Sequence, residues 1–237
     1  MNLDSLLISH DAALLGVLRP TLEKMSVNVD VCTEKRTGND MLAKRKFDAV
    51  IIDCDDLQGG VNMLQDLRGT QSNAKSVTFA VLNGKTSTQE AFQLGANFVL
   101  QKPLTPLHAT RCFHAALNFM IRERRRYFRC PLEMPVRLSI PRIGDLTATS
   151  TNLSEGGIAI RVASQLQKDT MIGISFTLPS KTSFELKGQI AWADGTGHAG
   201  IQFIEVPQSS QYQLEKWLTE RLQDEMPRTM QGYASLH

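Results

Sequence analysis

The sequence predicts an α/β domain with a parallel sheet, followed by a small all-β domain and a C-terminal helix. Short, continuously apolar segments alternate with amphipathic segments over the first half of the chain, as in parallel sheets covered by helices on both faces. Strands of alternating polarity, separated by turn residues, follow and are typical of a small barrel or sandwich. An apolar stripe at helical spacing comes near the end.

In the first half, apolar runs predict strands, and apolar residues at helical spacing predict the helices between them. The run Ala49-Val50-Ile51-Ile52 is apolar throughout and ends at Asp53. The expected strands are 6–8, 27–31, 49–52, 77–82 and 98–100. The expected helices are 12–24, 39–46, 61–67, 89–94 and 104–121.

In the second half, six short strands and one helix are expected. The strands are 136–140, 147–153, 158–162, 171–178, 184–192 and 199–206, and the helix is 211–222. Trp192 and Trp217 are expected to anchor the core, because large aromatic side chains are usually buried. The expected domains are 1–121 and 122–225, followed by a tail at 226–237 that is frayed after Pro227.

Composition excludes several classes of protein. The net charge of +2 over 237 residues is too small for a general nucleic-acid binder. The four cysteines lack paired spacing, which predicts free buried thiols. No apolar run approaches the roughly 20 residues that span a bilayer, and no signal segment is evident. The histidines lack metal-ligand spacing, and no nucleophile–base–acid arrangement appears. We therefore expect a cytoplasmic, non-enzymatic protein without membrane insertion.

Five arginines lie between residues 122 and 129. The planar guanidinium donates two parallel hydrogen bonds to a phosphate or a guanine edge. The pairs Arg125/Arg129 and Arg122/Arg126 both have RxxxR spacing, and the first pair is preferred because a strand begins directly after it. A solvated helix end is the simpler alternative, since cations suit a helix C-terminus.

A polar turn, Asn152-Leu153-Ser154-Glu155-Gly156-Gly157, follows an expected strand. Small polar groups beside two glycines leave room for a planar ligand, although such residues also form simple β-turns. The RxxxR segment, this NxSxxG turn, Trp192 and the later segment Gly200-Ile201-Gln202-Phe203 together resemble the PilZ domain, a bacterial receptor for cyclic di-GMP. The resemblance covers residues 122–222 and implies a six-stranded barrel with a C-terminal helix.

This resemblance implies a cyclic-di-GMP site formed by both motifs. Arg125 and Arg129 would hold phosphates and guanine edges. Asn152 and Ser154 would bond a guanine base or hold the turn that receives it, and Arg124 would contact the second guanine of an intercalated ligand dimer. The glycines that would let the backbone approach the ligand are Gly156 and Gly157.

The first 121 residues resemble the receiver domain of two-component response regulators, which implies a flavodoxin-like (βα)5 fold. Asp53 occupies the position of the phosphoacceptor, and Lys102-Pro103 matches the family's lysine and following proline. Asn83 stands where the family has a hydroxyl residue. These three residues would form a vestigial phosphoacceptor region.

The acidic pair with which a receiver holds Mg²⁺ is missing, because its positions read Ser9 and His10, and Asp11 follows one position late. Without two carboxylates the metal would be poorly held, and phosphoryl transfer to Asp53 would lose its charge neutralisation. We therefore expect a degenerate receiver without a metal, whose surface docks a protein partner or forms a homodimer. The acids that offer a different way to recruit a cation are Asp53, Asp55 and Asp56.

Together these features predict a bacterial cyclic-di-GMP effector with no cofactor. Ligand binding would be relayed by reorientation of the domains or by partner docking, with motility or biofilm formation among the expected outputs. The alternative is a phosphorylation-controlled response regulator whose PilZ-like domain need not bind nucleotide. Binding to a nucleic-acid polymer is not expected, since the charge outside the arginine cluster is balanced.

Overall fold

The computed structural model describes residues 2–227. These residues divide into two compact units, one formed by 2–124 with 225–227 and the other by 125–224. The predicted frayed tail, from residue 228 onward, lies outside the described residues. No helix in the described part is long and apolar enough to cross a membrane.

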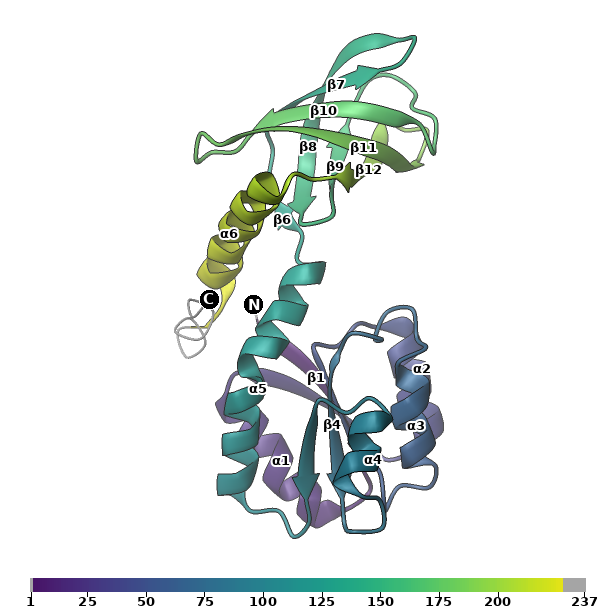
Figure 1. Cartoon of the computed structure of the whole chain (residues 1–237), viewed down its shortest axis with the longest axis vertical. Helices are drawn as coiled ribbons and strands as arrows, with labels where there is room; N and C mark the ends of the chain where they lie inside the picture. Colours follow the sequence, from purple (N-terminus) through teal and green to yellow (C-terminus); the bar gives the residue numbers. More distant parts are fainter. Residues whose placement is uncertain (1, 228–237) are drawn as a thin grey trace. The chain divides into compact units, whose positions relative to one another are not determined.

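The first unit is a parallel sheet of five strands in the order β2-β1-β3-β4-β5 (Figure 1). Its strands are β1 (Leu3–Ile8), β2 (Val27–Cys32), β3 (Ala49–Asp53), β4 (Val77–Leu82) and β5 (Phe98–Gln101). Its helices are α1 (Ala12–Lys24), α2 (Lys35–Lys44), α3 (Gly60–Leu67), α4 (Thr88–Gln93) and α5 (Pro106–Tyr127). This strand order is the flavodoxin-like arrangement, so the predicted (βα)5 fold is confirmed.

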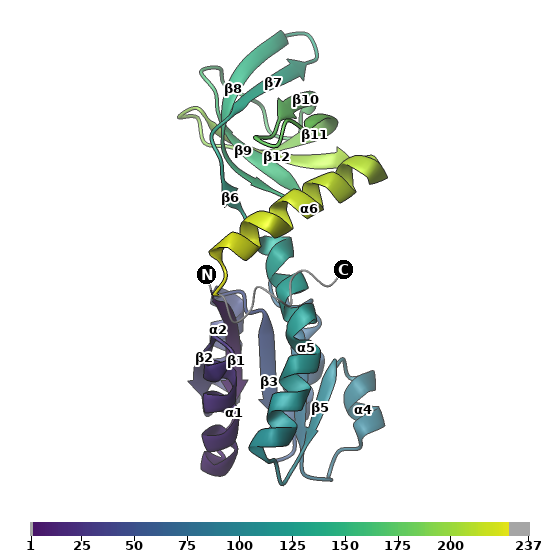
Figure 2. The same ribbon diagram turned by 90° about the vertical axis from the view of Figure 1, so that its left-hand side faces the viewer.

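The sheet is covered on both faces, as its apolar strands require. Helices α1 and α5 lie on one face and α2, α3 and α4 on the other (Figures 1 and 2). Every residue of β3 and β4 is buried. Phe113 of α5 packs edge-on against Phe79 of β4, with ring centroids 5.0 Å apart, and thereby fixes α5 on the sheet.

The second unit is a closed barrel. The strands are β6 (Cys130–Pro131), β7 (Pro135–Ile140), β8 (Gly144–Ser154), β9 (Gly157–Arg161), β10 (Met171–Thr177), β11 (Ser183–Ala193) and β12 (His198–Glu205). They pair in the order β6-β8-β7-β10-β11-β12-β9, and β9 pairs back with β8. Six strands therefore form a ring, with the short β6 added beside β8, which confirms the predicted six-stranded barrel. Helix α6 (Gln208–Glu225) follows.

Of the two tryptophans that were expected in the core, only Trp217 is buried. The apolar stripe of α6 is buried, including Trp217 at 7% exposure, as expected. Trp192 is 47% exposed, so its predicted place in the core is wrong. A Cβ at Gly200 of the neighbouring strand would overlap the indole, so this glycine lets the ring lie against the backbone of β12. Three of the four cysteines are buried, and all four are free, as predicted.

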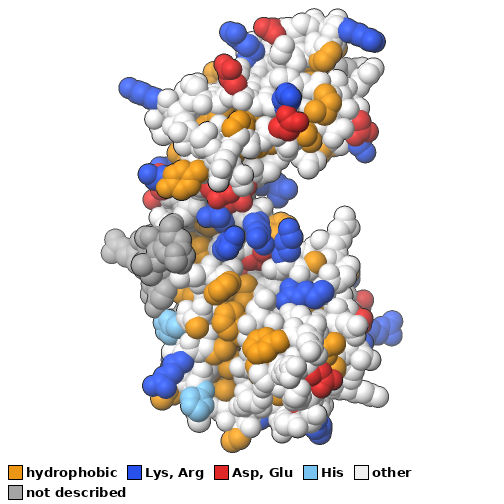
Figure 3. All heavy atoms as spheres, viewed as in Figure 1, with side chains coloured by type: hydrophobic (Ala, Val, Ile, Leu, Met, Phe, Trp, Pro, Cys, Tyr) orange, Lys and Arg blue, Asp and Glu red, His pale blue; other side chains and the backbone are white. Residues whose placement is uncertain are grey.

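Several large apolar side chains of the first unit remain on its surface. Leu107 and Phe119 of α5 are 57% and 55% exposed, and Phe92, in α4, is 48% exposed. Figure 3 shows hydrophobic side chains, in orange, on one face of this unit. Other large apolar side chains of α5, among them Phe113 and Leu117, are buried, so only part of this helix is left for other contacts.

Candidate functional site

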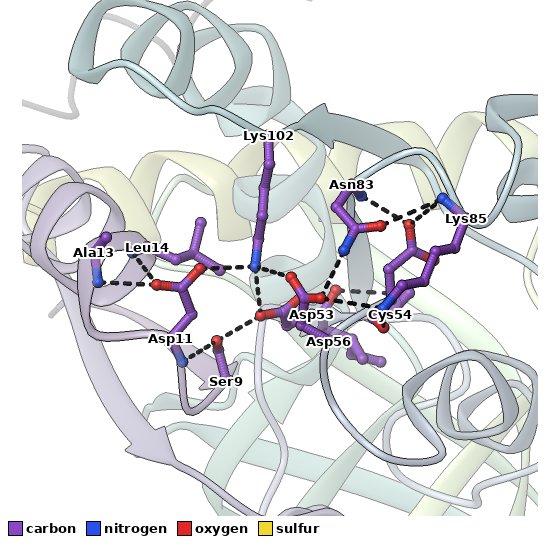
Figure 4. A network of polar contacts seen from close by, with 12 residues as sticks. Ser9, Asp11, Ala13, Leu14, Asp53, Cys54, Asp56, Asn83, Lys85 and Lys102 are labelled. Carbon is purple, nitrogen blue, oxygen red and sulfur yellow. Dashed lines mark hydrogen bonds and ion pairs between the residues drawn. The ribbon is translucent and has the colours of Figure 1, made fainter.

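The first candidate site lies at the carboxyl edge of the parallel sheet, where polar side chains follow several strands. Asp53 ends β3 and is fully buried, and Lys102 follows β5 directly. The Lys102 ammonium lies 2.8 Å from Asp11 Oδ2, 2.9 Å from Asp53 Oδ2 and 2.7 Å from Asp56 Oδ2 (Figure 4). One lysine thus holds three carboxylates, which we call the Lys102 cluster.

Asp11 joins the Lys102 cluster because it caps helix α1. Its Oδ1 accepts hydrogen bonds from the backbone amides of Ala13 and Leu14, at 2.9 and 3.1 Å. This geometry aims the other oxygen, Oδ2, at Lys102. Although Asp11 comes one position later than the expected acidic pair, its carboxylate thus reaches Lys102. The capping role supplies the physical reason, because an N-cap aspartate turns back toward the start of its helix.

The loop after β4 closes the other side of the Lys102 cluster. The Asn83 side-chain amide donates to Asp56 Oδ1 at 2.6 Å, and the Asn83 backbone amide donates to Asp55 Oδ2 at 2.7 Å. Backbone amides of Lys85 and Thr86 also donate to the Asp55 carboxylate. The structure thus places Asp53, Asn83 and Lys102 at this edge of the sheet, where the Asn83 side-chain amide is bonded to Asp56.

Charge interactions shift the pKa values of this group. Burial opposes a charged Lys102, but the three carboxylates outweigh that cost and raise its pKa well above the ordinary value. The hydrogen bond from Lys102 lowers the pKa of Asp11 and of Asp56. Lys102, Asp11 and Asp56 are therefore ionised at neutral pH.

Carboxylates are the ligands that Mg²⁺ prefers, so the Lys102 cluster has to be tested as a metal site. One oxygen each of Asp11, Asp53 and Asp56 lies within 4.8 Å of the others, and Asp53 Oδ1 is buried without a hydrogen-bond partner. However, the Lys102 ammonium contacts all three acids at 2.9 Å or less. A divalent ion would have to displace this lysine, so the residues do not fit a resident metal as they stand.

The second candidate site lies where the two predicted motifs meet in the barrel unit. Strand β6 begins directly after Arg129 and pairs with the end of β8, with Cys130 opposite Leu153 and Pro131 opposite Asn152. This register brings the end of the RxxxR segment beside the NxSxxG turn. Two segments about two dozen residues apart in the chain therefore form one surface.

Arg125 makes a direct contact between the two motifs. Its Nε lies 2.5 Å from Oε1 of Glu155, which is inside the NxSxxG turn. Its Nη2 lies 3.5 Å from Oε2 of Glu215 in α6, and its Nη1 lies 3.3 Å from the hydroxyl of Thr219. The Arg125 side chain is 23% exposed. Arg129 is exposed, with Nη1 3.4 Å from the carbonyl of Tyr127.

Helix α5 extends through the arginines. It was expected to end at Ile121, with Arg125 on a loop, but it continues to Tyr127, so that expectation is wrong. Arginine and glutamate are good helix formers, and side chains of the last turns are tied to the first unit. Glu123 Oε1 lies 2.6 Å from Lys46 Nζ, with the Glu123 side chain only 3% exposed.

Arg124 is bound within the first unit. Its Nη2 lies 2.7 Å from Asp4 Oδ2 and 2.7 Å from Asp48 Oδ2, and it donates to the carbonyl of Asn2 at 3.0 Å. Burial raises the pKa of Asp48 to about 6, against the opposing effect of Arg124. Arg124 is therefore not brought to the NxSxxG turn in this structure.

The turn itself is shaped by its own hydrogen bonds. Ser154 donates from its hydroxyl to the carbonyl of Gly157 at 3.0 Å, and the amide of Phe203 donates to the carbonyl of Gly156 at 2.9 Å. A Cβ at Gly157 would overlap the carbonyl oxygen of Ile201, whereas a Cβ at Gly156 would meet open space. Gly157 is thus required by the close approach of β12, and Gly156 borders the free surface.

Comparison with family models matches these two units. The model described as the PilZ domain matches residues 123–220, and the model described as the response regulator receiver domain matches residues 6–111. This chain joins a receiver domain to a PilZ domain. PilZ domains form a family of cyclic-di-GMP effectors, and both kinds of domain are typically regulatory and non-enzymatic. No curated protein matches the chain.

Solved structures of both kinds resemble parts of the chain. The CheY4 chemotaxis response regulator of Vibrio cholerae is 18% identical, with a TM-score of 0.45, covering 48% of this chain and 98% of its own. The receiver domain of the Pseudomonas aeruginosa sensor histidine kinase PA1611, which carries a coordinated magnesium ion, is 17% identical, with a TM-score of 0.43 over 48% and 97%. The PilZ domain of CeSA from a cellulose-synthesizing bacterium is 18% identical, with a TM-score of 0.34 over 40% and 98%.

Sequence reasoning missed three residues of these sites. In the receiver domain, Asp11 was detectable from its place directly before a helix, the usual position of a capping acid. In the PilZ domain, Glu155 was visible inside the NxSxxG turn, but nothing in the sequence pairs it with Arg125. Glu215 carries no local signal, because its partner lies 90 positions away in the chain.

Proposed function

We propose that this chain is a non-enzymatic cyclic-di-GMP effector whose PilZ domain binds the ligand where β6 and β8 pair. The pairing of Cys130 with Leu153 carries this proposal, because it brings an RxxxR segment beside an NxSxxG turn. Guanidinium groups can hold the phosphodiesters and guanine edges. The proposed ligand residues are Arg125, Arg129, Asn152, Ser154, Gly156 and Gly157.

Arg124 is a further proposed ligand residue, for a second, intercalated nucleotide. To reach it, Arg124 would have to leave Asp4 and Asp48, both of which contact it at 2.7 Å. Breaking a largely buried ion pair costs several kcal/mol. The number of ligands bound per chain therefore reports whether Arg124 is released.

We propose that the receiver domain is degenerate and works through its surface. Support comes from Lys102, which already neutralises the acids that would otherwise hold a metal. Leu107 and Phe119 offer exposed apolar area for a protein partner or a second copy of the chain. Ligand binding at residues 125–129 would be relayed through α5, which leads from one domain into the other.

Isothermal titration calorimetry with cyclic di-GMP tests the binding proposal. Wild type should bind, and Arg125→Ala combined with Arg129→Ala should abolish binding. Arg122→Ala, which removes an exposed arginine of the alternative RxxxR pair, is the matched control and should bind as wild type does. A folded wild type that releases no heat at any ligand concentration would refute the proposal. Loss of binding in Arg122→Ala alone would assign the site to the other arginine pair.

A further inference from the structure

The first arginine of the proposed ligand site is already neutralised by two carboxylates. Arg125 Nε is 2.5 Å from Glu155, and Nη2 is 3.5 Å from Glu215. A phosphodiester oxygen would seek the same guanidinium nitrogens, because carboxylates and phosphates are both anions that pair with arginine. The two glutamates therefore stand where ligand phosphate would have to bind Arg125.

The charges around Arg125 weaken the hold of the two glutamates on this arginine. Two carboxylates face one guanidinium, with Arg126 as a further positive charge acting on Glu155. Burial raises the pKa of Glu155, and the nearby Glu215 raises it further, whereas Arg125 lowers it. A carboxylate that is partly desolvated and close to another carboxylate is held less firmly than an isolated ion pair. An arriving phosphate can therefore displace it, although at a cost in free energy.

The two glutamates come from different elements of the PilZ domain. Glu155 is part of the NxSxxG turn between β8 and β9, and Glu215 lies in the middle of α6. The second oxygen of Glu215 accepts a hydrogen bond from Gln211 at 2.9 Å. A cavity of about 270 Å³, lined by both glutamates together with Phe203, Gln211 and Leu214, lies beside them. Glu155 thus has space into which its side chain can move.

We propose that Glu155 and Glu215 set the affinity of this PilZ domain by occupying Arg125 until a phosphodiester replaces them. Replacement transfers Arg125 to the ligand, so binding also releases the contacts of Arg125 with Glu215 and Thr219 of α6. This inference rests on the proposed function and adds a device that regulates the same site. The opposite role, in which the glutamates hold Arg125 ready for the ligand, predicts the opposite effect of their removal.

Calorimetric titration with cyclic di-GMP of the full chain separates the two roles. Glu155→Gln should lower Kd about tenfold, which corresponds to about 1.4 kcal/mol. Glu215→Gln, at the longer distance, should lower Kd roughly two- to threefold, since weaker ion pairs contribute less. Glu185→Gln removes an exposed carboxylate of β11 and controls for the general change in charge, so its Kd should match wild type. Glu155→Ala repeats the test if the amide variant is unstable.

The outcomes distinguish this inference from the proposed function. Suppose that wild type binds cyclic di-GMP and Arg129→Ala does not. Unchanged or weaker binding by both Glu155 variants then overturns only the present inference. Equal tightening in Glu185→Gln would do the same, because the effect would then be nonspecific. Absence of binding in wild type and in every glutamate variant overturns the proposed function together with this inference.

Discussion

Both domains contain a cation held by acidic side chains, and the two arrangements differ in how completely they are enclosed. Lys102 contacts three carboxylates between 2.7 and 2.9 Å, its side chain is 13% exposed, and Asp53 is fully buried. Arg125 contacts Glu155 at 2.5 Å and Glu215 at 3.5 Å, with 19% and 29% of those side chains exposed. The receiver cluster thus surrounds its cation with three carboxylates, of which Asp53 is fully buried and Asp11 and Asp56 are each 30% exposed.

This difference separates a structural ion cluster from an exchangeable one. A fully buried carboxylate such as Asp53 that loses its partner has no access to water, so its desolvation penalty appears as instability. Glu155 instead borders a cavity of about 270 Å³ into which its side chain can turn when another anion arrives. On our proposal, the same chemistry stabilises the receiver domain and leaves the PilZ domain able to exchange an ion pair for a ligand.

The largest effect is expected from removing the central cation of the receiver domain. Lys102→Ala leaves three carboxylates unneutralised and should lower the free energy of unfolding by about 3–5 kcal/mol. Urea unfolding followed by far-UV circular dichroism measures it. The control is Lys85→Ala, an ammonium that is 68% exposed and 3.5 Å from Asp56, which should cost less than about 1 kcal/mol. Equal losses in the two variants would show that the cluster is not tightly coupled.

A smaller effect is expected at the turn of the PilZ domain. Gly157→Ala places a Cβ against the carbonyl of Ile201 and should destabilise the barrel by about 1–3 kcal/mol. Gly156→Ala points into open space and should change stability by less than about 0.5 kcal/mol. Both tryptophans, Trp192 and Trp217, lie in this domain, so their fluorescence follows its unfolding. A cost at Gly156 as large as that at Gly157 would contradict this assignment.

Acid should stabilise the receiver domain through Asp48. Its pKa is raised from 3.8 to about 6, so between these values the folded chain binds a proton that the unfolded chain does not. Stability from this group therefore increases as pH falls from 7 to about 4, by an amount on the order of 2 kcal/mol. Carboxylates with lowered pKa, such as Asp4, lose their contribution only below about pH 4.

Amide hydrogen exchange in β3, corrected for the intrinsic pH dependence, measures this effect. Asp48→Asn keeps an acceptor for Arg124 but removes the titration, so the gain in protection between pH 7 and 4.5 should disappear. A gain of the same size in the variant would assign the pH dependence to another group.

The smallest effect is expected from a phosphoryl donor. Acetyl phosphate with Mg²⁺ should leave the intact mass of the wild type unchanged, because Lys102 already neutralises the acids around Asp53. The control is Asp53→Asn under identical conditions. A phosphoryl adduct on wild type that is absent from the variant would show that the receiver domain is active and that its ion cluster can also exchange.

Local patterns predicted most of the fold, because apolar periodicity and turn residues act over short stretches of chain. Helix α1 (Ala12–Lys24) and strand β4 (Val77–Leu82) lie at the predicted bounds. The end of α5 was not predictable, since its last turns are tied down by Lys46 and Asp48. Those partners lie more than 70 positions away, and no local pattern reports them.

The sequence by itself determined the two fold classes, the positions of the RxxxR and NxSxxG motifs, and the place of Asp53 and Lys102 at the carboxyl edge of a sheet. These follow from side-chain type and spacing along the chain. Only the tertiary structure decided which carboxylate each cation meets: Asp11 at Lys102, Asp48 at Arg124, and Glu155 at Arg125. The reason is that ion-pair energy depends on separations of a few ångströms and on local burial, and folding sets both between residues far apart in the chain.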